Sequence, residues 1–154
     1  MPLSGNAQLI GGTCGTDHTE MITERLLKNK EALRRGLVQT RNAISYIPIN
    51  IVVVGESDGD GRVKISRILD QIDALNEDFI DSEFQFYLEG DIKFLDNSIA
   101  YDSQTSFSAL SKMEEQKSRN ALNIFLVNTA KHSSGSSSGV ILGYYSPLRD
   151  WLVI

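Results

Sequence analysis

A serine-rich loop offers the first pattern with chemical meaning. Residues 135–139, GSSSG, match the G-x-S-x-G pattern in which the serine, here Ser137, is a nucleophile at a strand-to-helix turn. That pattern requires a helix after the serine and a histidine later in the chain. Here a strand-like segment with a proline follows, and both histidines come earlier. We therefore interpret GSSSG as a flexible polar loop and not as a hydrolase site.

The acidic loop GESDGDGR resembles several ligand-binding loops in part. A phosphate loop needs Lys and then Ser or Thr where Arg62 and Val63 stand, and three acidic side chains would repel a phosphate. Lys64 occupies the position of the third glycine of a dinucleotide-binding loop. If Glu56 begins a calcium loop, Arg67 falls at the twelfth position, where a bidentate Glu belongs. We interpret the segment as a solvated turn.

Metal ligands and acid–base pairs are few. His18 and His132 lie far apart in the sequence, and neither has a second His or Cys at ligand spacing. Glu114 and Glu115 belong to a charged helical segment and are interpreted as solvated. Cys14 stands in the glycine-rich stretch GGTCGT, where composition alone favours an incidental free cysteine over a reactive thiolate.

Composition limits the classes of function. The chain has 154 residues, a formal net charge of −5 and one cysteine. This length fits one domain, and the acidic balance disfavours nucleic-acid binding, which requires a basic face. No stretch approaches the roughly 20 apolar residues of a membrane span, and the first residues lack the pattern of a secretory signal peptide. A single cysteine excludes an internal disulfide framework.

Hydrophobic periodicity predicts an α/β fold with a mainly parallel sheet. Residues 47–54, IPINIVVV, are apolar on both faces apart from Asn50, which predicts a strand buried on both sides. Residues 65–79 form the clearest amphipathic helix, and a strand at 83–88 completes a parallel crossover. The remaining predicted elements are helices at 19–36 and 104–118 and strands at 121–127, 139–145 and 150–154. Residues 3–17 are predicted to be irregular. Residues 92–95 either extend the preceding strand or begin another.

Several of these stretches, in order, resemble the pappalysin family of metzincin zinc endopeptidases. IPINIVVVG is similar to the family's first strand, and QIDALNEDF (71–79) is similar to the end of its first long helix, which is the most specific match. FQFYL and LNIFLVN (122–128) resemble the next two strands. LGYYSP (142–147), followed by DWLVI, resembles the edge strand, its proline turn and the strand after it. CGT (14–16), with a helix behind it, resembles the N-terminal prosegment.

The resemblance implies a metzincin-like upper subdomain, a twisted mixed five-stranded sheet with one antiparallel edge strand and crossover helices. It divides the chain into a prosegment-like region with an amphipathic helix (1–45) and the N-terminal part of a catalytic domain (46–154). In the family, the strand resembling DWLVI leads to a helix bearing H-E-x-x-H, then a third zinc-binding His and a Met-turn. None of these is present, so we expect a chain truncated before its zinc-binding helix, with one sheet face left bare unless the N-terminal helix covers it.

The same resemblance assigns two sets of site residues. Leu142, Gly143, Tyr144 and Tyr145 fall on the edge strand that pairs antiparallel with an extended peptide substrate, and an exposed edge offers backbone groups for such pairing. The alternative is that the two tyrosines simply cover the sheet edge. Cys14 is similar to a cysteine-switch ligand, a prosegment thiolate that occupies the fourth zinc position and keeps the enzyme latent.

Two functions remain open from the sequence. The first is an incomplete zinc-dependent endopeptidase, secreted in its parent form, in which a zinc-activated water hydrolyses a peptide bond. The zinc belongs to the complete parent; this chain alone is expected to bind none and to be inactive. The second is a non-catalytic α/β peptide-binding module or a degenerate peptidase. In both, the expected partner is a protein or peptide in extended conformation, with no nucleic acid and no membrane span.

Overall fold

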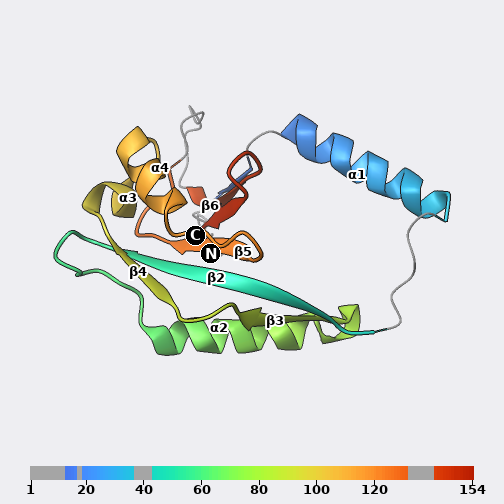
Figure 1. Cartoon of the computed structure of the whole chain (residues 1–154), viewed down its shortest axis with the longest axis horizontal. Helices are drawn as coiled ribbons and strands as arrows, with labels where there is room; N and C mark the ends of the chain where they lie inside the picture. Colours follow the sequence, from blue (N-terminus) through green and yellow to red (C-terminus); the bar gives the residue numbers. More distant parts are fainter. Residues whose placement is uncertain (1–12, 17–18, 37–42, 132–140) are drawn as a thin grey trace, which may run out of the picture.

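The computed structural model describes residues 13–16, 19–36, 43–131 and 141–154 (Figure 1). Ser137, His18 and His132 therefore lie outside the described residues. The helices are α1 (Thr19–Arg34), α2 (Ile65–Asp78), α3 (Ser98–Asp102) and α4 (Phe107–Glu114), with a 3₁₀ turn, η1 (Ile80–Ser82). The strands are β1 (Thr13–Thr16), β2 (Ser45–Gly55), β3 (Phe84–Leu88), β4 (Lys93–Asp96), β5 (Leu122–Leu126), β6 (Ile141–Ser146) and β7 (Trp151–Val153).

The strands form one mixed, mainly parallel sheet, which confirms the predicted α/β class. Its order is β1-β6-β7-β5-β2-β3. β3 pairs with the first part of β2, and β4 pairs with its last part. Neighbouring strands are parallel except for the antiparallel pair β6 and β7. The sheet has seven strands where five were expected. One addition is β4, which begins a strand of its own, and the other is β1, in a segment predicted to be irregular.

Helices cover both faces of the sheet (Figure 1). On one face, α2 packs on β2 and β3, and Ile49, Ile51, Val53 and Ile68 form a buried cluster. On the other face lie α3 and α4, over a larger cluster that includes Phe125. Because β2 contributes to both clusters, it is buried on both sides, as its apolar run predicts.

Periodicity predicts the long helix α2, whereas side-chain caps set the starts of the short helices α3 and α4. α2 matches its predicted span to within one residue. The weak helix expected at 104–118 is shortened to α4, because the Ser106 side chain accepts a hydrogen bond from the Ala109 N–H and fixes a later start. α3 was not predicted, since five residues are too few to show a helical period; it begins where Asn97 caps the Ala100 N–H.

α1 forms at its predicted place and stands apart from α2 in Figure 1. Ion pairs join Glu24 to Lys28 and Glu31 to Arg34 within the helix, and Glu31 also pairs with Arg35, directly after its end. The hydrogen bond from Lys28 lowers the pKa of Glu24, and those from Arg34 and then Arg35 lower the pKa of Glu31. α1 therefore carries its own charge pairing along an exposed surface.

Hydrogen bonds of two side chains, Asn76 and Gln85, tie strand β3 to α2. The Asn76 Nδ2 donates to the Phe86 carbonyl at 3.0 Å, and the Phe86 N–H donates to Asn76 Oδ1 at 2.6 Å. Gln85 Nε2 adds a bond to the Asn76 carbonyl at 3.2 Å. Both backbone groups of Phe86 are thus occupied by α2, which keeps them from pairing with another strand.

Replacing Asn76 with alanine is expected to lower the free energy of unfolding by about 1–3 kcal/mol, because two partly buried backbone groups lose their partner. Urea denaturation followed by circular dichroism measures this change. Asp73→Ala, at an exposed position of the same helix, is the control and should stay within about 0.5 kcal/mol of the parent. Equal losses in the two variants would contradict the role assigned to Asn76.

Candidate functional site

The four residues assigned to peptide binding lie together on β6, but their side chains differ in exposure. Tyr144 is only 2% exposed and belongs to the buried cluster over which α3 and α4 lie. The Tyr145 hydroxyl donates to Asp150 Oδ1 at 2.8 Å, and Leu142 is 62% exposed. Tyr144 is thus a core residue, and an extended segment alongside β6 would meet the strand's backbone and Leu142.

β6 is not the outermost strand, because β1 pairs with it in parallel. The prediction that β6 forms the edge of the sheet is therefore wrong: among the described residues, β1 is the outermost strand on this side. The register shifts between Thr13 and Cys14, so that Leu142 is left out of the pairing as at a β-bulge. The paired positions are Thr13 with Ile141, Cys14 with Gly143, Gly15 with Tyr144 and Thr16 with Tyr145.

This pairing brings the two predicted parts of the site together. Cys14, assigned from the sequence to a prosegment, lies in register with Gly143, assigned to the substrate strand. Periodicity could not find β1, since four residues with two small side chains show no strand pattern. The only sequence signal for this segment was the resemblance of CGT to a prosegment.

Gly143 allows β6 to approach β7 closely. A Cβ at this position would lie 2.8 Å from the Val153 carbonyl oxygen and 3.5 Å from the Ile154 Cα. The nearest atoms belong to backbone, which cannot move aside as the end of a side chain can. The close pairing of β6 and β7 thus depends on glycine, which has no side chain, at position 143.

Gly143→Ala is expected to lower the free energy of unfolding by about 1–3 kcal/mol, because β6 must shift away from β7 to relieve the contact. Thermal or urea unfolding measures the loss. Leu142→Ala changes the neighbouring exposed position and should alter stability by no more than about 0.5 kcal/mol. If Gly143→Ala proves as stable as Leu142→Ala, the contact with Val153 does not constrain β6.

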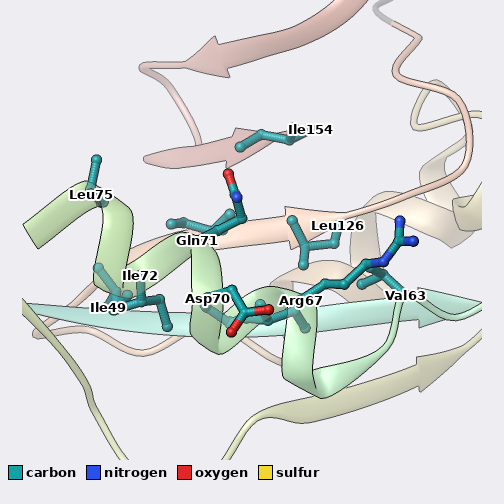
Figure 2. Close-up of a pocket in the computed structure, with 12 residues that line it drawn as sticks. Ile49, Val63, Arg67, Asp70, Gln71, Ile72, Leu75, Leu126 and Ile154 are labelled. Carbon is teal, nitrogen blue, oxygen red and sulfur yellow. The ribbon is translucent and has the colours of Figure 1, made fainter. Parts of the chain in front are cut away.

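An apolar groove of about 670 Å³ lies between α2 and strands β2 and β5, and Ile154, the residue after β7, also lines it. Figure 2 shows Gln71 and Leu75 of α2 on one side and Leu126 and Ile154 on the other. Ile154 remains 49% exposed, whereas Ile68, on the buried side of α2, is 4% exposed. α1 does not fill this groove, since it stands apart from α2 (Figure 1). Among the described residues, part of this sheet face is thus left uncovered.

The acidic loop after β2 is organised by an arginine. Arg62 pairs with Asp96 at the end of β4, and its guanidinium carbon lies 4.9 Å from the centre of the Phe94 ring. The Glu56 N–H donates to the Asp60 carbonyl, closing the turn. These contacts are those of a closed turn, and none of them gathers the acidic side chains of the loop around a ligand position.

The described residues do not fit a zinc site. Among them, no group of three or more His, Cys, Asp and Glu side chains is placed to hold a metal ion. Glu114 and Glu115 are exposed and pair with Lys117 and Lys112, as expected for solvated carboxylates.

No protein-family model matches the chain, and searches of curated proteins and of solved structures returned no significant match. Within the described part of the chain, no helix is long and apolar enough to span a membrane. The described residues offer three features for binding: strand β6, strand β1 with Cys14 beside it, and the apolar groove along α2.

Proposed function

We propose that this chain is the N-terminal part of a secreted metzincin-type zinc endopeptidase, and that β1 keeps the parent enzyme latent. One observation carries the proposal: β1, with Cys14, pairs with β6, the strand that the sequence resemblance assigns to substrate binding. Two assignments made from stretches more than 120 residues apart thus concern adjacent strands. The mixed sheet with its antiparallel β6–β7 pair is consistent with the upper subdomain of such an enzyme.

The direction of β1 supports an inhibitory role. A substrate that pairs antiparallel with β6 would run opposite to β1, which is parallel to it. β1 therefore occupies the strand position of a substrate while its peptide bonds have the reverse direction. A segment held in this way blocks the site without offering a bond in the orientation that a substrate presents, and Cys14 is the residue on it that has a thiolate to offer a metal.

The apolar groove beside α2 also supports the proposal, because it offers a place for a helix that follows the described strands. The resemblance implies a further helix after the strand resembling DWLVI, and a helix needs an apolar surface on which to pack. The groove provides one along α2, formed by Ile72 and Leu75 of α2 with Ile124 and Leu126 of β5. We assign this groove to the zinc-binding helix of the parent protein, which would bring the metal ligands with it.

The test begins with the transcript downstream of the Ile154 codon. We expect an in-frame H-E-x-x-H followed by a third histidine, and we expect the protein expressed from the complete frame to contain one zinc ion per chain by mass spectrometry. A reading frame that closes without this motif would overturn the proposal. It would favour the non-catalytic peptide-binding module, for which the pairing of an extended segment with β6 is the supporting observation.

In the protein from the complete frame, Cys14→Ser is expected to abolish latency, since a hydroxyl is a far weaker zinc ligand than a thiolate. Cleavage of a fluorogenic peptide without prior activation measures the effect: the variant should be active from the start, and the parent only after release of the prosegment. Thr16→Ser keeps both strand and thiolate and should remain latent. A Cys14→Ser variant as latent as the parent would rule out the thiolate as the blocking ligand.

A further inference from the structure

We draw no further inference here: the strongest candidate, the apolar groove between α2 and strands β2 and β5, belongs to the site already described, and nothing in the structure shows what else would cover it.

Discussion

Replacing Asn123 with alanine is expected to lower the free energy of unfolding by about 2–5 kcal/mol, one of the two largest effects among single substitutions that we anticipate. Asn123 lies on β5 and is 1% exposed. Its Oδ1 accepts from Asn50 Nδ2 at 2.9 Å and from the Ser118 N–H at 2.8 Å. Its Nδ2 donates to the carbonyls of Ser118 and Ala121 at 3.0 and 3.2 Å.

This amide links the sheet to the turn that leads into β5. Asn50 also donates to the Gln116 carbonyl at 3.1 Å, so that the two asparagines together hold the segment between α4 and β5. Alanine at position 123 would leave the partly buried backbone groups of Ser118 and the buried amide of Asn50 without their partner. Each buried polar group left unpaired costs about 1–3 kcal/mol, and the loss of several explains the expected size of the effect.

Chemical denaturation at equilibrium measures the prediction for Asn123. Asn120→Ala removes an asparagine from the same turn at an exposed position and is the matched control, with an expected change within about 0.5 kcal/mol. Asn123→Asp adds a second test, because it keeps the acceptor for Asn50 and the Ser118 N–H but loses both donated bonds. We expect it to lie below the parent in stability; a variant as stable as the parent would show that the amide does not hold this turn.

Asn50 and Asn123 also show where sequence reasoning reaches its limit. The apolar run around Asn50 predicted β2 correctly, because β-branched residues on both faces favour a buried strand whatever their partners are. The apolar run itself gives no reason for Asn50, the single amide within it. Its partner lies 73 residues away, and no local pattern indicates which of the chain's asparagines a parallel pairing will bring beside it.

The candidate site was predictable to a similar degree. The strand containing Tyr144 and Tyr145 was found from its composition and its place before a proline turn. Tyr144 was expected at an edge but lies in the core, since the register with Val153 puts both residues on the covered face. The pairing of β1 with β6 was not predicted. The four residues of β1 pair through backbone groups, and backbone pairing leaves no pattern of apolar side chains in the sequence.

Gly61→Ala is the second substitution with a large expected effect, a loss of about 2–5 kcal/mol in the free energy of unfolding. Gly61 has φ +76°, a left-handed conformation that costs an L-residue about 1–2 kcal/mol. A Cβ here would also lie 2.1 Å from the Tyr101 hydroxyl oxygen and 2.6 Å from its Cζ. The Tyr101 side chain is 9% exposed and donates its hydroxyl to the Gly61 carbonyl at 3.2 Å, so it has little room to withdraw.

Gly90→Ala separates the two causes of this loss. Gly90 has a similar φ of +86°, but a Cβ at this position would meet no atom within 4 Å. Its replacement should therefore cost only the backbone strain, about 1–2 kcal/mol, and the difference between the variants measures the contact with Tyr101. Because Tyr101 packs between the acidic loop and the larger buried cluster, its displacement would also loosen the loop that follows β2. Equal losses for Gly61→Ala and Gly90→Ala would show that Tyr101 can move aside and that its contact with Gly61 does not constrain the loop.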